Sequence, residues 1–429
     1  MRFEVFLQQG KLSYRIAFKR LPVIEASALG ISIDGVDFGQ GVTIGKAERY
    51  RLNERYVWRG VHSETVNHCN GAKISLKRSG GDSNFTLEVR AFNDGAAFRF
   101  VVPTAESGAD KARVPDEATG FTFPAGGVAW FHDLEGHYEG IPARKGIAEI
   151  KAGEWAAPPL TVKLPNNAGY ASVTEAALMN YAGMALQSDG QRGFNARLGH
   201  AQHVSYPFRL RYPTEVERLK QPAAIAGTIT TPWRVVMIAA DLNSLVNNDI
   251  ISHVSPPPDK KLFPAGMKTN WLKPGRAVWK YLDGGENTLE EVKNFSQLAG
   301  QLGFEYQVVE GFWSRWSEAQ MREAVEFSRQ NKVGLLFWKH SKDLRTPDAR
   351  KQFFGLCQRV GVVGAKIDFF DHEAKETIDL YQTLLKEAAE HKLLLDFHGA
   401  NKPAGEARTW PNEMTREGIY GLEHRNAKA

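Results

Sequence analysis

The chain contains 429 residues, of which 42% are hydrophobic and 24% are charged, and its formal net charge is +5. This composition is that of an ordinary globular protein that is long enough for two or three domains. The cationic residues are spread along the chain, so the charge does not favour nucleic-acid binding. No apolar run approaches the roughly 20 residues of a membrane-spanning helix, and we expect no membrane partner. Residues 1–7 are too short and too charged for a signal peptide, so either the protein is cytoplasmic or a signal was never part of this sequence.

The first 250 or so residues predict antiparallel β structure. Leu12, Tyr14, Ile16 and Phe18 alternate with polar residues, as in a half-buried strand. The same alternation recurs at residues 85–89 and 98–102, on either side of an Asn-Asp-Gly turn signal. Further strands are expected at residues 169–174, 203–210 and 233–239. Many strands without a long helical pattern predict a large β-sandwich over residues 1–252, followed by a linker rich in Pro and Lys over residues 253–275.

From residue 276 onward the pattern changes to repeated βα units. Apolar runs recur at intervals of roughly 30 residues, the length of one such unit. They begin near Ala277, Phe304, Val333, Val362, Leu393 and Ile419. Repeated units of this kind predict a parallel barrel or an open α/β sheet. Six strands are fewer than the eight of a (β/α)₈ barrel, so we expect residues 276–429 to form an incomplete barrel with open edges. Such a chain is expected to be poorly folded or inactive.

The segments between the apolar runs carry helix signals. Thr288 with Glu291, and Ser317 with Gln320, have the spacing of capping boxes. Thr346 precedes a proline at the first helical position. Two apolar stripes have helical spacing, namely Leu289, Val292, Phe295, Leu298 and Leu302, and then Ile378, Tyr381, Leu385 and Ala388.

Lys366 and Asp368 lie in the fourth apolar run, residues 362–370. Side chains alternate along a strand, so these two residues share one face. A cation beside a carboxyl group lowers the pKa of that group and keeps it ionised. Parallel barrels place catalytic groups at the carboxyl ends of their strands. We therefore interpret Asp368 as a candidate catalytic residue.

Other polar groups end the remaining strands and would lie on the same rim: Asp283, Glu310, Lys339, His340, Asp371, His398, Glu423 and His424. Each is also compatible with a structural role as a cap or a salt-bridge partner. Two carboxylates from the fourth and sixth strands are the pair that glycoside hydrolysis requires. Phosphate-loop, nucleophile-elbow and His-Glu-x-x-His patterns do not occur. Cys69 and Cys357 imply neither a disulfide framework nor a thiolate metal site.

Several stretches of the chain resemble glycoside hydrolase family 97. In the first half they are Tyr138-Glu139-Gly140, Val173-Thr174-Glu175-Ala176, Thr231-Pro232-Trp233-Arg234 and residues 241–250. In the second half they are Val309-Glu310-Gly311, Lys366-Ile367-Asp368, Trp410-Pro411-Asn412, Thr415-Arg416-Glu417-Gly418 and Gly421-Leu422-Glu423. The resemblance implies a multidomain β and α/β protein with an N-terminal β-super-sandwich, a linker, a (β/α)₈ TIM barrel and a small C-terminal β domain. We expect that last domain and the final barrel units to be absent from this sequence.

The resemblance also implies a mechanism. Inverting members of the family carry a catalytic base after the His that ends the fifth strand, whereas this chain has Gly399 after His398. Retaining members use an Asp at the end of the fourth strand as the nucleophile, which matches Asp368, and an acid/base that matches Glu423. We therefore expect a retaining exo-α-glycosidase, with α-galactosidase as the preferred activity. An α-glucosidase, a β-L-arabinopyranosidase, a non-catalytic carbohydrate-binding protein and a phosphate-handling barrel enzyme are the alternatives.

Members of the family bind calcium through one sandwich glutamate and two barrel glutamates, and the matching residues are Glu175, Glu417 and Glu423. Carboxylate oxygens suit Ca²⁺, although Glu175 is also compatible with a salt bridge. The candidates for sugar binding are Lys366, Glu310, Trp313, Trp338 and His398, and each tryptophan is equally compatible with a place in the core. The expected partner is an α-linked oligosaccharide or galactoside, and the resemblance implies a bacterial protein that is periplasmic or secreted. The sequence does not indicate an oligomeric state.

Overall fold

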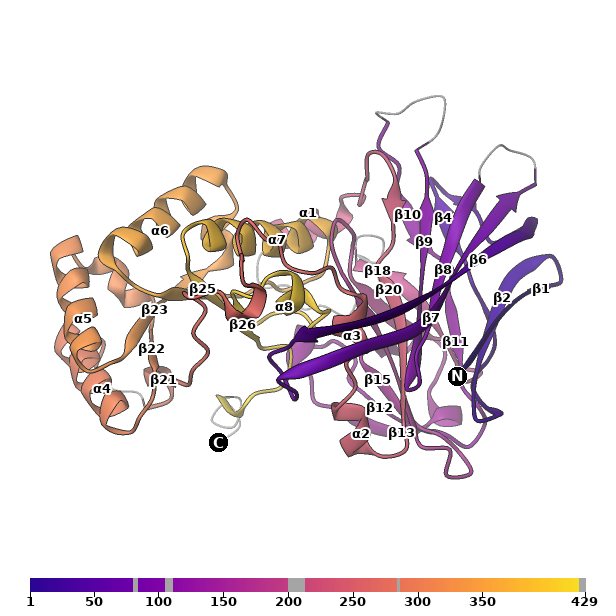
Figure 1. The fold of residues 1–429 in the computed structure, drawn as a ribbon, viewed down its shortest axis with the longest axis horizontal. Helices are drawn as coiled ribbons and strands as arrows, with labels where there is room; N and C mark the ends of the chain where they lie inside the picture. The colour runs from indigo at the N-terminus through magenta and orange to yellow at the C-terminus, as the bar shows by residue number, and fades with distance from the viewer. Residues whose placement is uncertain (80–83, 105–110, 200–212, 284–285, 424–429) are drawn as a thin grey trace. The chain divides into compact units, whose positions relative to one another are not determined.

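The computed structural model describes residues 1–79, 84–104, 111–199, 213–283 and 286–423 (Figure 1). The chain divides into two compact units. The first unit comprises Met1–Pro256 with two short later segments, His372–Asp379 and Lys402–Glu406. The second unit comprises Pro257–Asp371, Leu380–Asn401 and Ala407–Ala429.

The first unit is built from antiparallel sheets. The largest has ten strands: β13 (Ala143–Gly146), β12 (Val128–Phe131), β15 (Leu160–Lys163), β16 (Tyr170–Ala176), β20 (Trp233–Ala239), β9 (Gly95–Val102), β8 (Asn84–Ala91), β7 (Glu64–Arg78) and β6 (Val42–Val57) in spatial order, with β19 (Ile229–Thr230) paired to β9. A three-stranded sheet has the order β1 (Arg2–Gln8), β2 (Lys11–Phe18) and β3 (Leu21–Ala28). A four-stranded sheet has the order β11 (Gly120–Thr122), β18 (Gly193–Leu198), β17 (Met184–Ser188) and β14 (Trp155–Ala156). A second three-stranded sheet has the order β10 (Pro115–Glu117), β4 (Ile31–Ile33) and β5 (Val36–Asp37).

Aromatic side chains join three of these sheets into a sandwich core. Tyr14 on β2 packs 5.0 Å from Phe98 on β9 and 6.4 Å from Phe121 on β11, between ring centroids. All three residues are fully buried. The Tyr14 hydroxyl, which burial would otherwise leave unsatisfied, donates to the Gly120 carbonyl at 2.8 Å. The predicted sandwich is therefore confirmed, and its expected strands at residues 12–18, 85–89, 98–102, 169–174 and 233–239 correspond to β2, β8, β9, β16 and β20. The strand expected at residues 203–210 lies outside the described residues.

The second unit contains a parallel sheet whose six strands follow chain order. They are β21 (Ala277–Trp279), β22 (Tyr306–Val309), β23 (Gly334–His340), β24 (Gly364–Asp368), β25 (Leu394–His398) and β26 (Glu413–Arg416). The helices between them are α4 (Leu289–Gln301), α5 (Glu318–Gln330), α6 (Pro347–Val360), α7 (Lys375–Glu390) and α8 (Glu406–Thr409). Helices α4 and α5 pack on β22 and β23 (Figure 1). The repeating βα pattern therefore forms a curled half-barrel, as expected.

The helix starts agree with the sequence signals. Thr288 caps α4 by accepting a hydrogen bond from the Glu291 amide, Ser317 and Gln320 form the full capping box of α5, and Thr346 caps α6 ahead of Pro347. The apolar stripe of α7 is buried as predicted, with Ile378, Tyr381, Leu385 and Ala388 at most 2% exposed.

The apolar stripe predicted for α4 is wrong at its end. Leu298 and Leu302 are 53% and 70% exposed, and the buried face of the helix is instead Val292, Ser296 and Ala299. The Ser296 hydroxyl is 2.5 Å from Gln307 Oε1 and 2.6 Å from the Ser328 hydroxyl. Small and hydroxyl side chains therefore occupy this contact, and hydrogen bonds satisfy the polar atoms buried there.

The sixth strand also differs from the prediction, because it is β26 (Glu413–Arg416) and not a run beginning at Ile419. Ile419 is 66% exposed and follows the strand. Residues of the expected linker pack into the second unit, where Phe263 and Leu272 form a buried cluster with Ala389 and Leu394.

Three short helices complete the first unit, α1 (Pro213–Lys220), α2 (Leu242–Val246) and α3 (Ile250–Val254). In the part of the chain that the structure describes, no helix has the length and apolar character needed to cross a membrane. The two cysteines, Cys69 and Cys357, are both free and buried, and burial raises the pKa of each thiol.

Candidate active site

Asp368 ends strand β24 and is held by donors from three directions. The indole Nε1 of Trp338 donates to Asp368 Oδ2 at 2.9 Å, and the backbone amide of Phe369 donates to Oδ1 at 2.8 Å. His398 Nδ1 lies 3.3 Å from Oδ1, and Lys366 Nζ lies 3.8 Å from Oδ2. The parallel register explains part of this grouping, because it pairs Asp368 with His398 on β25 and Lys366 with Trp338 on β23.

These contacts decide the charge of Asp368. The side chain is only 5% exposed, and burial by itself would raise the pKa of its carboxyl group. The hydrogen bond and charge of His398, the charge of Lys366 and the hydrogen bond of Trp338 outweigh burial, so the pKa lies below its usual value. Asp368 is therefore an ionised carboxylate that is largely shielded from water.

His398 connects Asp368 to two further carboxylates. Its Nε2 lies 2.5 Å from Glu417 Oε2 and 3.6 Å from Glu423 Oε1. Burial would lower the pKa of the imidazole, but its contacts with Asp368 and Glu417 raise that pKa to about 10. The ring is therefore an imidazolium at neutral pH and offsets part of the negative charge of the three carboxylates.

His398, Glu417 and Glu423 form a group that could hold a metal ion. Each offers one ligand atom, and these three atoms lie within 4.8 Å of one another. Glu417 and Glu423 fit calcium, since both offer carboxylate oxygens, which this cation prefers. The nitrogen of His398 is not a typical calcium ligand.

Glu175, the third residue that the family resemblance suggests for calcium, has other partners in the first unit. It is fully buried, and its Oε1 is 2.7 Å from both Lys402 Nζ and the Met184 amide. Arg234 pairs with its Oε2. Burial would raise the pKa of Glu175, but Lys402 and Arg234 lower it. Lys402 also contacts Glu373 Oε1 at 2.6 Å, so Glu175 belongs to a buried network of ion pairs and does not fit a calcium ligand as it stands.

Trp279, at the end of β21, is a contact residue that the sequence analysis missed. Lys366 Nζ lies 3.6 Å from its ring centroid, and the ring of His398 lies 5.5 Å away. Its Nε1 donates to Glu310 Oε1 at 2.5 Å, and its other aromatic neighbour is Tyr281, stacked at 4.8 Å. The only available signal was its position at a strand end.

Glu310 also lines a pocket of 530 Å³ that follows strands β21 and β22. The other lining residues are Lys280, Tyr281, Asn287, Gly311, Phe312, Ser314 and Arg315. Hydrogen-bonding groups and aromatic rings together are the combination that saccharides require, because a sugar has both hydroxyls and apolar C–H faces.

The other strand-end residues divide between the site and the scaffold. Trp338 contacts Asp368, but Trp313 stacks on Phe337 at 4.5 Å and donates its indole N–H to the Trp338 carbonyl, which is a core position. Lys339 pairs with Asp343 at 2.9 Å. The side chain of Asp283 and all of His424 lie outside the described residues.

Asp396 is a second site residue that the sequence analysis missed. The register of β24 and β25 pairs it with Lys366, one step before the pair of Asp368 and His398. Burial raises the pKa of Asp396 to about 6, against the lowering effect of Lys366. Its spacing of two residues from His398 was the signal that could have found it.

Known proteins resemble this chain along almost its whole length. A probable retaining α-galactosidase from Streptomyces bingchenggensis is 29% identical to this chain, and the match covers 99% of this chain. A retaining α-galactosidase from Bacteroides thetaiotaomicron is 25% identical, and that match covers 96% of this chain. The chain spans 64% and 65% of the lengths of these two curated relatives. A crystal structure of a β-arabinopyranosidase has the same fold, with a TM-score of 0.85 at 20% identity over 99% of this chain and 69% of that one.

Family models cover both units in order. The model described as glycosyl-hydrolase 97 N-terminal matches residues 1–257, and the model described as glycoside hydrolase 97 matches residues 271–419. The chain belongs to glycoside hydrolase family 97.

Proposed function

We propose that this chain acts as a retaining exo-α-glycosidase on terminal α-linked sugars, with α-galactosides as the preferred substrates. The observation that carries the proposal is the environment of Asp368, a shielded carboxylate kept ionised by His398, Lys366 and Trp338. Such a carboxylate is suited to attack an anomeric carbon, because it is charged and little hydrated. The two curated relatives, which are named as retaining α-galactosidases, support the same reaction and substrate.

The reaction would have two steps. Asp368 attacks the anomeric carbon from the face opposite the leaving group, and Glu423 donates a proton to the departing oxygen. The resulting glycosyl ester on Asp368 is then hydrolysed by a water molecule that Glu423 deprotonates, which restores both carboxyl groups and retains the anomeric configuration. Lys366 and Glu310 would bind sugar hydroxyls, and the pocket after β21 and β22 would take the leaving sugar.

Gly399 supports retention over inversion. It adopts a left-handed backbone with φ of 50°, and a Cβ atom added there would lie 3.0 Å from Asp368 Oδ1. A side chain at this position, where inverting members of the family carry their base, would therefore crowd Asp368. The absence of a side chain leaves the carboxylate room to act as the nucleophile.

We also propose that Glu417 and Glu423 hold a calcium ion. Their spacing and oxygen ligands support the assignment. A bound ion would supply a fixed positive charge beside the reacting groups. Membership of the family supports a periplasmic or secreted location in a bacterium.

The test uses aryl α-galactoside, α-glucoside and β-L-arabinopyranoside with the unmodified chain and with Asp368→Gly and Asp368→Asn. Galactoside cleavage by the unmodified chain would support the proposal and overturn the expectation of a poorly folded or inactive barrel. Both substitutions should abolish that cleavage, and azide should rescue Asp368→Gly with formation of the β-glycosyl azide. Asp343→Asn, a change of the same type at the Lys339 ion pair, should retain activity.

Two results would reject the assignment. Substantial activity of Asp368→Asn would exclude Asp368 as the nucleophile. Proton NMR that detects the β-anomer as the first product of an α-galactoside would exclude retention. Absence of turnover on all three substrates would favour a carbohydrate-binding role.

A further inference from the structure

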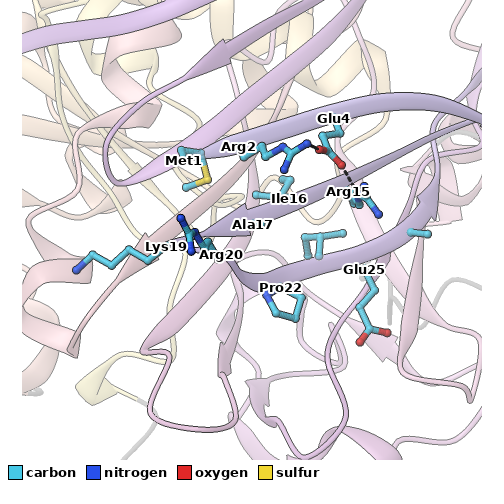
Figure 2. Close-up of a pocket in the computed structure, with 12 residues that line it drawn as sticks. Met1, Arg2, Glu4, Arg15, Ile16, Ala17, Lys19, Arg20, Pro22 and Glu25 are labelled. Carbon is cyan, nitrogen blue, oxygen red and sulfur yellow. Dashed lines mark hydrogen bonds and ion pairs between the residues drawn. The ribbon is translucent and has the colours of Figure 1, made fainter.

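One face of the sheet formed by β1, β2 and β3 is hollowed into a pocket of 830 Å³ (Figure 2). The antiparallel register places Arg2 opposite Ala17 and Glu4 opposite Arg15, and all four residues line the pocket. The intervening residue of β1, Phe3, stacks on Tyr14 in the sandwich core at 5.4 Å. The pocket is therefore on the face of the sheet that is turned away from the core.

The lining of this pocket carries an excess of positive charge. Arg2, Arg15, Lys19 and Arg20 contribute four cationic groups, against the carboxylates of Glu4 and Glu25. Both carboxylates are already paired, Glu4 with Arg2 and Arg15 together (Figure 2), and Glu25 with Arg192 at 3.1 Å.

Lys19 and Arg20, unlike Arg2 and Arg15, do not pair with a carboxylate of the described residues, and both are exposed. They are thus available to an anion from solution.

Lys19 and Arg20 form a tight turn at the end of the hairpin. Both residues are left-handed, with φ of 47° and 70°, in the two-residue turn between β2 and β3. Such turns favour Asn-Gly, because asparagine and glycine adopt the left-handed conformation at a lower cost in energy than other residues. The turn therefore carries two adjacent cationic side chains in place of the residue types that it prefers.

From this pocket we infer a binding site for an acidic oligosaccharide, that is, one that carries carboxylate groups on its sugar rings. Guanidinium groups bind carboxylates through paired N–H donors. Ala17 and Pro22 provide apolar surface beside the cations, as the C–H faces of a sugar ring require. The volume is that of a site for a molecule of several rings and exceeds what a lone inorganic anion fills.

The test measures binding of trigalacturonate by calorimetry to the unmodified chain and to Lys19→Asn/Arg20→Gly. This pair of substitutions removes both free cations and installs the residues that the turn prefers, so the variant should melt at the same temperature or higher. Lys260→Gln/Lys261→Gln removes the same charge at two adjacent exposed residues elsewhere and is the matched control. Maltotriose and inorganic phosphate are the comparison ligands.

We expect the variant to bind trigalacturonate at least about tenfold more weakly, as loss of charge-assisted hydrogen bonds requires, and the control to bind it normally. Salt should weaken the interaction. Maltotriose binding should not respond to the variant, which separates this pocket from the proposed catalytic site. Four outcomes would overturn the inference: no binding of trigalacturonate, equal binding by the variant, equal weakening in the control, or phosphate binding as tight as that of trigalacturonate.

Discussion

Asp368 and His398 are held in charge states that their burial opposes. Burial alone would protonate the carboxylate and deprotonate the imidazole, but their mutual contact and those with Lys366 and Glu417 reverse both effects. Each group therefore depends on the other for its charge. A substitution that removes one neighbour should change the pH at which the remaining groups titrate, even where the fold is preserved.

Trp338→Phe tests this dependence. The substitution removes the indole donor to Asp368 Oδ2 and leaves an aromatic ring in place. Without that donor the pKa of Asp368 rises, so the nucleophile becomes protonated at a higher pH than before. We expect the acidic limb of the kcat/KM profile to move to higher pH, with a fall in kcat/KM of about ten- to a hundredfold for a lost hydrogen bond to a charged group.

Trp313→Phe is the control for that experiment. It removes an indole N–H that donates to a backbone carbonyl and not to Asp368. Its acidic limb should coincide with that of the unmodified chain. An unshifted limb in Trp338→Phe, or an equal shift in both variants, would contradict the assigned role of the Trp338 hydrogen bond.

The sequence could predict neighbours within one strand but not those between strands. Lys366 and Asp368 share a face because side chains alternate, and that spacing is visible in the sequence. The contacts of Asp368 with Trp338 and His398 depend on the register of three strands, which only the folded sheet defines. Trp279 and Asp396 were missed for the same reason, since neither belongs to a recognisable motif.

At the scale of elements, strand β26 shows how a polar segment can form a barrel strand. Its sequence lacks an apolar run, so hydrophobic pattern favoured the segment at Ile419 instead. Backbone hydrogen bonds to β25 flank the strand at its two ends. Leu395 N donates to Asn412 O just before the strand, and Glu417 N donates to Phe397 O just after it, both at 2.8 Å. Its Arg416 pairs with Glu413 at 2.7 Å. Met414 packs against the buried cluster of Phe263 and Leu272. Backbone pairing, internal neutralisation and this single apolar contact thus hold the strand, and none of them is visible as a hydrophobic pattern.

The segments His372–Asp379 and Lys402–Glu406 belong to the first unit although they follow strands of the second in sequence. Backbone hydrogen bonds attach them, Gly183 N to Glu373 O and Ala177 N to Ala404 O at 2.8 Å. Lys402 adds ion pairs, since it is 1% exposed and contacts both Glu175 and Glu373. Lys402→Met should leave these buried carboxylates without that cation. We expect the free energy of unfolding to fall by about 3–5 kcal/mol, as for other broken buried ion pairs, measured by urea denaturation.

Lys375→Met provides the comparison within the same segment. Lys375 pairs with Asp379 at 2.5 Å, and the side chain of Asp379 is 40% exposed. Loss of this pair should cost at most about 1 kcal/mol, the usual value for exposed pairs. If the two substitutions destabilised the chain equally, Lys402 would have no special part in holding the segments.

At the scale of the whole molecule, both family models match in order along the chain, one in the antiparallel sheets and one in the parallel sheet. The change of hydrophobic pattern near residue 276 predicted this organisation, because many alternating strands are typical of a sandwich and repeated βα units are typical of a parallel sheet. The smaller sheets of the first unit could not be predicted, since strands such as β5 and β14 have only two residues each.

Calcium binding is a property to test on the intact chain. A ligand that binds only the folded state stabilises it by mass action. After treatment with EGTA, we expect added Ca²⁺ to raise the melting temperature by a few degrees, which corresponds to about 2–3 kcal/mol at a hundredfold excess over the dissociation constant.

Glu417→Gln should abolish the calcium-dependent shift, because an amide is a weaker ligand than a carboxylate. Mg²⁺ at the same concentration should have a smaller effect, since it requires a tighter octahedral site. A melting temperature that does not respond to Ca²⁺, or a full response in Glu417→Gln, would remove the ion from this proposal.

The burial of both native thiols has a practical consequence for solution spectroscopy. Cys69 and Cys357 are buried with raised pKa values, so they should react slowly with maleimides and methanethiosulfonates. A cysteine introduced at Val61 in the first unit and another at Leu298 in the second, which are 58% and 53% exposed, would then be the preferred attachment points. Paired nitroxide or fluorescent labels at these positions would report the distance distribution between the two units without prior removal of any native cysteine.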